Sequence, residues 1–279
     1  MMHTDPLFSV ENKICIVTGG FGQLGVQYAK ALFARGAKVA IWARTVSDER
    51  IARFFTAQEC QTGRLKFYQA DIAKKDDINR VLDQMALDFG GAPDVLVNNA
   101  GIDTQPSAPP EVSGPFEYFP EAVFREVVET NLTGTFLCCQ AVGLRMVQAN
   151  KPGSIINVGS IYGMVSPVQD IYAYKEELTG VPFIKPVAYA AAKSGIYNLT
   201  RYLATYWGRK NIRVNTFTPS GVWRETQDER FQANYCNHIP IGRMAQEDEY
   251  NGAIIFLASD ASRYMTGANL VMDGGWTAW

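Results

Sequence analysis

The chain has 279 residues, of which 47% are hydrophobic and 19% charged, so it has the composition of a globular protein that can bury a large core. Its formal net charge is -2 and it has no basic block that could follow a phosphate backbone, which argues against a nucleic-acid partner. It also lacks an unbroken apolar stretch of about 20 residues, so we expect no membrane span.

Short runs of β-branched and aromatic residues alternate with helical segments along the chain. The predicted strands are residues 14–17, 39–42, 65–68, 95–97, 154–157, 212–215 and 269–272. The predicted helices are residues 23–35, 48–58, 75–89, 121–148, 187–208 and 247–258. This order predicts a doubly wound (Rossmann) α/β fold, with helices on both faces of a mostly parallel seven-stranded sheet, in one domain over residues 1–279. Ligands should bind beyond the carboxyl ends of the strands.

The first strand leads into the turn Thr18-Gly19-Gly20-Phe21-Gly22-Gln23-Leu24-Gly25 and then into a helix. In this context Gly20-x-Gly22-x-x-Gly25 predicts a dinucleotide site. Glycines let the backbone approach a pyrophosphate, and the helix N-terminus supplies unpaired N–H groups. The alternative is an ordinary glycine-rich turn between a strand and a helix.

The second strand ends in Trp42-Ala43-Arg44, with no carboxylate to bind ribose hydroxyls. Arg44 can grip the extra phosphate of NADP, so NADP is the preferred cofactor and NAD is possible. The alternative for Arg44 is a solvated charge at a strand end. Asp48 and Glu49 follow Ser47, a predicted helix cap, and suit the positive end of that helix.

Two polar residues occupy positions that indicate chemistry. Asn131 lies inside a long helical pattern, where asparagine is locally unfavourable, so it either holds a water or is a tolerated polar residue at a kink. Ser160 follows the fifth strand, where its hydroxyl either binds a substrate carbonyl or caps the local backbone.

Tyr189 and Lys193 are four residues apart and therefore share one face of a helix. The ammonium of Lys193 could lower the pKa of Tyr189 toward neutrality, which general acid–base catalysis requires. Tyr206 and Lys210 repeat the spacing, but they lie roughly 25 Å farther along the helix and are expected to be structural.

Together these residues resemble the short-chain dehydrogenase/reductase family in its compact form, over nearly the whole chain. The motifs occur in the family order: Thr18-Gly19, Asp71, Asn98-Asn99-Ala100-Gly101, Asn131, Ser160, Tyr189 with Lys193, Pro219, and Asp273-Gly274-Gly275. The resemblance implies an NAD(P)-dependent oxidoreductase that interconverts a secondary alcohol and a ketone by hydride transfer.

The resemblance also assigns roles to residues. Tyr189 transfers the proton, Lys193 binds the nicotinamide ribose and lowers the pKa of the tyrosine, Ser160 orients the substrate oxygen, and Asn131 holds a relay water. Asp71 and Asn98 lie near the adenosine, and residues 212–222 flank the nicotinamide. The expected cofactor-binding set is Gly19, Gly20, Phe21, Gly22, Gln23, Leu24, Gly25, Arg44, Asp71, Ile72, Asn99, Ala100, Gly101, Tyr189, Lys193, Pro219, Gly221 and Val222.

The chain departs from the compact family pattern in places. Gln23 replaces a usual glycine, as in the extended members that process nucleotide sugars; Ser220 separates Pro219 from Gly221; and the interval from Ser160 to Tyr189 is long. Two competing functions follow: a nucleotide-sugar epimerase or dehydratase that retains NAD(P), and a noncatalytic NADP-sensing protein.

Segments 161–186 and 222–240 are expected as irregular loops that overhang the site. Their polar and aromatic residues suit a sugar, sugar acid or polyol, with Ser160, Tyr162, Trp223 and His238 as candidate substrate contacts, although they could simply solvate a loop and a lone histidine is more often structural.

The remaining features concern the setting of the protein. Its five cysteines include no C-x-x-C pair and no metal-binding cluster is visible, which indicates neither a disulfide framework nor a metal site. Residues 1–13 lack the basic and apolar regions of a signal peptide, so we expect a cytoplasmic protein. The family resemblance implies a homo-oligomer, a dimer or tetramer, in which Trp276 and Trp279 could pack between subunits. The alternative is a hydrophobic tail that packs on the core of its own chain.

Overall fold

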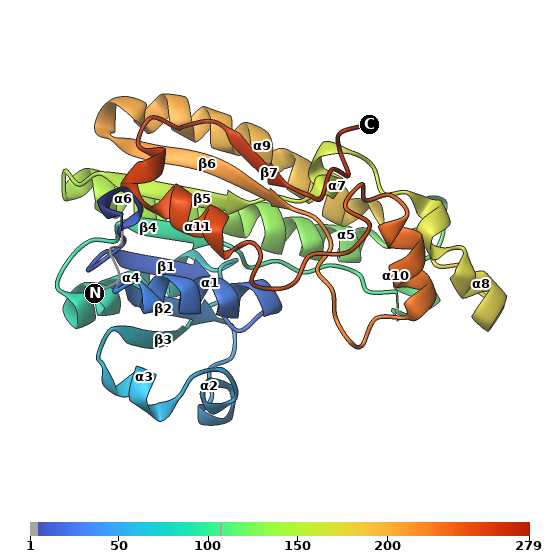
Figure 1. Ribbon diagram of the computed structural model, residues 1–279, viewed down its shortest axis with the longest axis horizontal. Helices are drawn as coiled ribbons and strands as arrows, with labels where there is room; N and C mark the ends of the chain where they lie inside the picture. Colours follow the sequence, from blue (N-terminus) through green and yellow to red (C-terminus); the bar gives the residue numbers. More distant parts are fainter. Residues whose placement is uncertain (1–4, 107) are drawn as a thin grey trace.

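Seven parallel strands form one sheet in the computed structural model, which describes residues 5–106 and 108–279 (Figure 1). The order across the sheet is β3-β2-β1-β4-β5-β6-β7, which confirms the predicted doubly wound fold. The strands are β1 (Ile14–Thr18), β2 (Lys38–Ala43), β3 (Leu65–Gln69), β4 (Val95–Asn98), β5 (Gly153–Val158), β6 (Ile212–Pro219) and β7 (Asn269–Met272). Residues 1–4, part of the segment expected to carry no signal peptide, lie outside the described residues.

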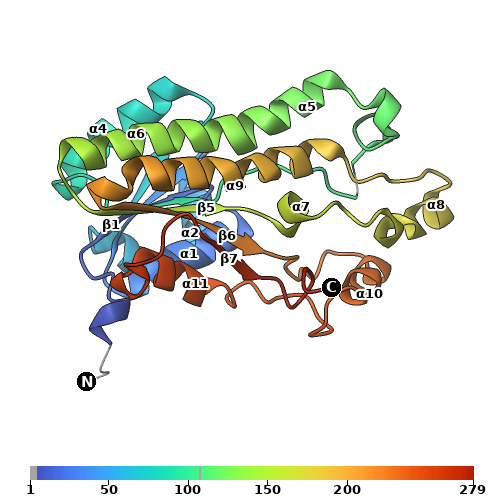
Figure 2. The same cartoon turned by 90° about the horizontal axis from the view of Figure 1, so that it is seen from above.

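Helices cover both faces of the sheet (Figure 2). One face packs against α1 (Gln23–Ala34) and α11 (Asn251–Ala258). The other packs against α4 (Lys75–Phe89), α6 (Gly134–Gln148) and α9 (Val187–Trp207). In β1, Cys15 and Val17 enter the first core and Ile14 and Ile16 the second, so successive side chains of a fully buried strand supply both cores.

The predicted helix over residues 48–58 is wrong in one respect, because it is two helices. These are α2 (Asp48–Phe54) and α3 (Ala57–Gln61). Thr56 and Glu59 form a capping box in which each side chain accepts a hydrogen bond from the other residue's backbone N–H. This reciprocal cap starts a new helix and therefore ends the first one.

The predicted helix over residues 121–148 consists of α5 (Glu121–Val128), the π-turn η4 (Glu129–Thr133) and α6. The predicted helix over residues 247–258 begins later, at Asn251, and the predicted strand over residues 212–215 continues to Pro219 because β6 pairs with β5 on one side and β7 on the other. The short 3-10 helices are η1 (Pro6–Phe8), η2 (Pro110–Val112), η3 (Phe116–Tyr118), η5 (Gln169–Tyr172), η6 (Gly208–Lys210) and η7 (Asp260–Ser262).

Segments 161–186 and 222–240 are more ordered than expected. They contain α7 (Ile161–Met164), α8 (Tyr174–Thr179) and α10 (Glu229–Cys236). Their apolar side chains form a third small core with Trp276, so burial of aromatic surface orders both segments beyond the strand ends.

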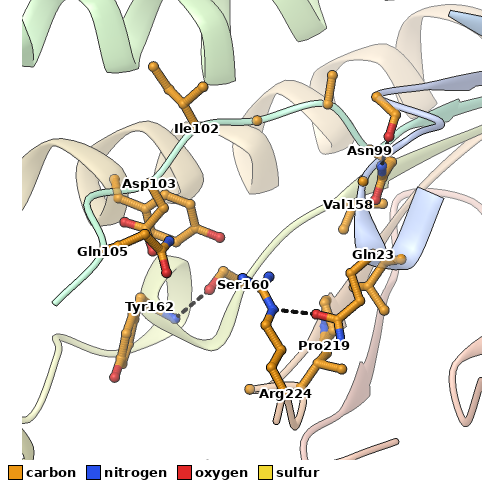
Figure 3. Close-up of a pocket in the computed structure, with 18 of the residues that line it drawn as sticks. Gln23, Asn99, Ile102, Asp103, Gln105, Val158, Ser160, Tyr162, Pro219 and Arg224 are labelled. Carbon is orange, nitrogen blue, oxygen red and sulfur yellow. Dashed lines mark hydrogen bonds between the residues drawn. The ribbon is translucent and has the colours of Figure 1, made fainter. Parts of the chain in front are cut away.

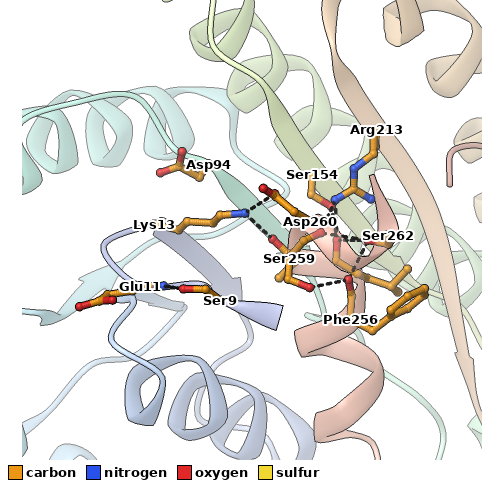
Figure 4. A network of polar contacts seen from close by, with 12 residues as sticks. Ser9, Glu11, Lys13, Asp94, Ser154, Arg213, Phe256, Ser259, Asp260 and Ser262 are labelled. Atoms are coloured by element: carbon orange, nitrogen blue, oxygen red, sulfur yellow. Dashed lines mark hydrogen bonds and ion pairs between the residues drawn. The ribbon is translucent and has the colours of Figure 1, made fainter. Parts of the chain in front are cut away.

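A polar network closes the opposite edge, where the strands begin (Figure 4). Lys13 Nζ lies 3.1 Å from Asp260 Oδ1, and Arg213 donates to the carbonyls of Leu257 and Ser259. These bonds satisfy the carboxyl end of α11 and hold it against β1 and β6. Within the described residues, none of the helices is both long and apolar enough to cross a bilayer.

Candidate active site

A cavity of about 990 Å³ lies beyond the carboxyl ends of the strands, at the point where the strand order reverses between β1 and β4 (Figure 3). This is where doubly wound sheets bind ligands. Most predicted site residues line it: Gly19, Phe21, Gly22, Gln23, Leu24, Arg44, Asp71, Ile72, Asn99, Ala100, Gly101, Ser160, Tyr162, Tyr189, Lys193, Pro219, Gly221 and Val222.

The glycine turn fits the pyrophosphate of a dinucleotide. Gly19 has φ +64°, and a Cβ there would lie 2.8 Å from the Cα of Ala100. A Cβ on Gly25 would lie 2.3 Å from the carbonyl oxygen of Gly19. Gly22 caps α1 without a side-chain hydrogen bond from the described residues, which leaves the first N–H groups of the helix to a ligand. Gly20 and Gly25 do not line the cavity but permit this close packing.

Gln23, the departure from the family glycine, ties the turn to the segment after β6. Its Nε2 donates to the carbonyl of Trp223 at 2.9 Å, and its Oε1 accepts from Arg224 Nε at 2.5 Å. Figure 3 shows the hydrogen bond between the Gln23 and Arg224 side chains, which both line the cavity. The glutamine therefore joins the two loops that a dinucleotide would touch.

Two arginines stand at the end of β2. Arg44 is exposed, and Arg50 on α2 lies with its guanidinium 5.0 Å from the ring centroid of Phe21; both line the cavity. Ser47 caps α2 through Arg50 N–H, as expected, so Asp48 and Glu49 face the helix N-terminus. Sequence reasoning missed Arg50, although its place in the first turn after a strand end was a usable signal.

Asn99 and Asn98 have different roles from one another. Asn99 Nδ2 donates to the carbonyls of Thr18 and Gly19, so it supports the glycine turn. Asn98, expected near the adenosine, is buried and donates to Asn157 Oδ1 at 2.9 Å. The Asn98 side chain is 3% exposed and does not line the cavity in this structure.

Asn131 braces the segment after β4. It is fully buried in the π-turn, its Oδ1 accepts from Ile102 N–H at 2.8 Å, and its Nδ2 donates to the Ile102 carbonyl at 2.8 Å. It does not line the cavity. The wider π-turn gives the amide room to pair with a backbone peptide, which offsets the local penalty of asparagine.

Tyr189 and Lys193 face the cavity from α9, as their spacing predicts. Lys193 is buried and donates to the Val158 carbonyl at 2.7 Å. Burial lowers the pKa of this lysine to about 8, opposed by the negative charge of Asp103. Its Nζ lies 5.8 Å from the centroid of the Tyr189 ring.

The expected lowering of the Tyr189 pKa does not occur in this geometry. Burial raises the pKa of Tyr189, Asp103 raises it further, and the Ser160 hydroxyl lowers it only partly. The prediction considered the field of one ammonium and left out the desolvation of the phenol, which is the larger effect here.

Ser160 is both the N-cap of α7 and a neighbour of the Tyr189 phenol. Its Oγ accepts from Tyr162 N–H at 3.2 Å and its hydroxyl lies close enough to influence the pKa of Tyr189. Tyr197, one turn beyond Lys193, donates to the Ser160 carbonyl at 2.8 Å. Tyr206, in contrast, is exposed, does not line the cavity, and stacks on Tyr202.

Trp223 and His238 do not line the cavity, so the structure does not bring these two candidate substrate contacts together with the other predicted site residues. The Trp223 side chain is partly exposed, and the His238 ring packs 5.3 Å from Trp276 in the third core. Sequence order placed these residues in the correct segment but could not give their orientation.

An ion pair at the substrate end was missed. Lys185 Nζ lies 2.5 Å from Asp103 Oδ2 and donates to the Thr104 carbonyl at 3.0 Å, and both paired side chains line the cavity. Asp103 follows the motif after β4 by two positions and Lys185 precedes Tyr189 by four. These offsets were the only signal in the sequence. Among the described residues, no group of three or more His, Cys, Asp and Glu side chains could hold a metal ion.

Known proteins match the chain over almost its full length. Residues 22–277 match a family profile described as enoyl-(acyl carrier protein) reductase. D-threitol dehydrogenase from Mycolicibacterium smegmatis is 31% identical, over 97% of this chain and 95% of its own. A short-chain dehydrogenase from Leptospira borgpetersenii with bound NAD+ has a TM-score of 0.83 and is 31% identical, over 99% of this chain and 97% of its own. A gluconate 5-dehydrogenase from Burkholderia cenocepacia, in complex with NADP and tartrate, has a TM-score of 0.81 and is 28% identical, over 98% of both chains.

The strand order, the glycine turn and the Ser160, Tyr189 and Lys193 side chains on one cavity agree with these matches. The chain therefore belongs to the short-chain dehydrogenase/reductase family, oxidoreductases that act on CH–OH groups and the corresponding carbonyls.

Proposed function

We propose that this protein interconverts a secondary alcohol and a ketone on a small polyhydroxylated substrate, a polyol, sugar or sugar acid. The observation that carries the proposal is the convergence of Ser160, Tyr189 and Lys193 on the same cavity as the glycine turn. Relatives named for threitol and gluconate support the substrate class.

Each side chain has a task in the proposed mechanism. A bound nicotinamide supplies or accepts the hydride. Ser160 holds the substrate oxygen, and Tyr189 gives it a proton in reduction or takes one in oxidation. Because burial raises the pKa of Tyr189, the phenol is protonated at neutral pH, which suits proton donation to a carbonyl. Lys193 would hold the nicotinamide ribose, and Asn131 would act through its two hydrogen bonds to Ile102, which fix the backbone beside which a relay water would bind.

For the cofactor we propose NADP in preference to NAD. Arg44 and Arg50 line the cavity at the end of β2, and Ala43 stands where an NAD-binding protein would present a carboxylate. Asp71 and Ile72 line the adjacent wall and would enclose the adenine.

We further propose a cytoplasmic homo-oligomer, dimer or tetramer, in which the chain works as one domain. Phe136 and Leu144 of α6 and Tyr202 and Tyr206 of α9 are exposed on neighbouring helices, which is apolar area that a second copy could cover. All five cysteines are free, as a reducing compartment favours. The mass in solution, measured by light scattering, tests this proposal, and a monomeric mass rejects it.

A net-reduction assay tests the function. The protein is mixed with NADP+ or NAD+ and a panel of polyols and sugars, and the absorbance of reduced nicotinamide is followed. We expect reduction that depends on the added alcohol. If the nicotinamide copurifies with the protein and no net reduction occurs, the epimerase or dehydratase alternative replaces the proposal; binding without any turnover indicates a sensor.

A further inference from the structure

The inner wall of the cavity contains an ion pair between a buried lysine and a partly buried aspartate, which the mechanism above does not use. Lys185 is 6% exposed. Two of the three N–H groups of its Nζ donate hydrogen bonds, one to Asp103 Oδ2 and one to the Thr104 carbonyl. Gln169 fixes the lysine backbone from both sides: its Oε1 accepts from Lys185 N–H at 2.9 Å and its Nε2 donates to the Lys185 carbonyl at 3.1 Å. The pair is therefore held in one geometry.

Joining two loops through this ion pair costs desolvation free energy. Burial removes the hydration of the Lys185 ammonium and part of the hydration of Asp103, and well-packed apolar side chains of similar volume often stabilise a protein as much or more. The other carboxylate oxygen, Asp103 Oδ1, is enclosed and has no hydrogen-bond partner among the described residues. Buried polar atoms are nearly always paired, so the Asp103 carboxylate keeps an unused hydrogen-bond acceptor within the wall of the cavity.

The position of the pair relates it to the reacting atoms. Asp103 and Lys185 line the same cavity as Ser160 and Tyr189, and Lys185 Nζ lies 5.6 Å from the centroid of the Tyr189 ring. Figure 3 shows Asp103 on the loop after β4, on the side of the cavity that Tyr162 occupies. A small substrate whose oxygen meets Tyr189 would therefore lie in the same cavity as the ion pair.

We propose that Asp103 and Lys185 recognise a hydroxyl group on the carbon next to the one that reacts, so that the preferred substrate is a neutral vicinal diol or the matching α-hydroxy ketone. This inference rests on the proposed function. The Asp103 side chain is 28% exposed, so a hydroxyl can donate to its carboxylate and accept from the third N–H of Lys185. A carboxylate would be repelled by Asp103, and an alkyl group would give neither charge a new partner. The pair is a specificity determinant and takes no part in proton transfer.

The test compares two alcohols of equal chain length, butane-2,3-diol and butan-2-ol, with the intact protein and NADP+ or NAD+. We expect the wild-type protein to favour the diol in kcat/KM by about 10- to 100-fold, the value of a hydrogen bond to a charged group. Asp103→Asn removes the charge with little change of shape. It should lose most of that preference, so that kcat/KM falls about 10-fold or more further for butane-2,3-diol than for butan-2-ol.

The controls separate recognition from a structural role. Asp83→Asn breaks the exposed Asp83–Arg145 pair, which does not line the cavity, and should leave the preference intact. Thermal unfolding of each variant checks that it is folded. If Asp103→Asn loses activity equally on both alcohols, the ion pair only holds the two loops together and does not bind the substrate, and the inference fails.

A second test uses the wild-type protein alone and needs no variant. Equal turnover of butan-2-ol and the diol overturns the inference and leaves the proposed function standing. Turnover of neither these alcohols nor any polyol or sugar overturns the proposed function, and the inference with it.

Discussion

Lys193 illustrates how burial sets the chemistry of a single side chain. Its ammonium is enclosed and has one hydrogen bond, to the Val158 carbonyl, in the described part of the chain. Burial lowers its pKa from 10.5 to about 8, while Asp103 acts in the opposite direction. A lysine in this state destabilises the fold, because the unfolded chain hydrates the same charge freely.

The variant Lys193→Met tests this description. Between pH of about 8 and 10.5 the unfolded wild-type protein binds a proton at this lysine that the folded protein does not, so the free energy of unfolding rises with pH across that window. We expect wild type to gain stability relative to Lys193→Met within the window and the difference to be constant below it. Denaturant unfolding at a series of pH values measures the difference in the free energy of unfolding between the two proteins. Both proteins contain the same tyrosines, so the effects of tyrosine titration on this difference largely cancel. A difference that is flat throughout contradicts the assignment.

Individual catalytic residues could be predicted from the sequence where one helix or one strand end defines their geometry. Tyr189 and Lys193 share a helical face, and Ser160 ends a strand, so their convergence follows from the topology. Asp103 and Lys185 are 82 residues apart, and their contact depends on the path of segment 161–186. No local pattern fixes that path, so the pair could not be predicted.

At the scale of elements, the end of β2 and the first turn of α2 form one unit. The capping of α2 by Ser47 directs Asp48 and Glu49 to the helix N-terminus, and Arg44 with Arg50 then supplies the cavity with positive charge. The break between α2 and α3 could not be read from hydrophobic periodicity, because a capping box depends on Thr56 and Glu59 hydrogen bonds.

This unit predicts the cofactor preference. Arg44→Asp should weaken NADP binding by about 10- to 100-fold and leave NAD binding unchanged or slightly stronger, because it removes a charged contact with the extra phosphate and adds a carboxylate. Fluorescence titration with each nucleotide measures both affinities. Arg53→Asp is the matched control, since Arg53 is on α2 but does not line the cavity. If the affinities for NADP and NAD fall equally, Arg44 does not bind the extra phosphate of NADP.

At the scale of the whole molecule, the parallel sheet brings distant segments to one edge. The strand order reverses between β1 and β4, which opens the cavity there, and the segments after β5 and β6 extend over it. Alternating strands and helices were enough to predict this arrangement, because right-handed crossovers leave few topologies. The packing of His238 on Trp276 was not predictable, since Trp276 belongs to a small aromatic core assembled from several segments.

The central claim is that Tyr189 transfers the proton while the rest of the cavity binds the reactants. Steady-state turnover and nucleotide binding of Tyr189→Phe test it together, on whichever alcohol the wild-type protein oxidises. We expect kcat to fall by about 100- to 10,000-fold while the affinity for the nucleotide is unchanged. A Tyr189→Phe protein that keeps most of its turnover would contradict it.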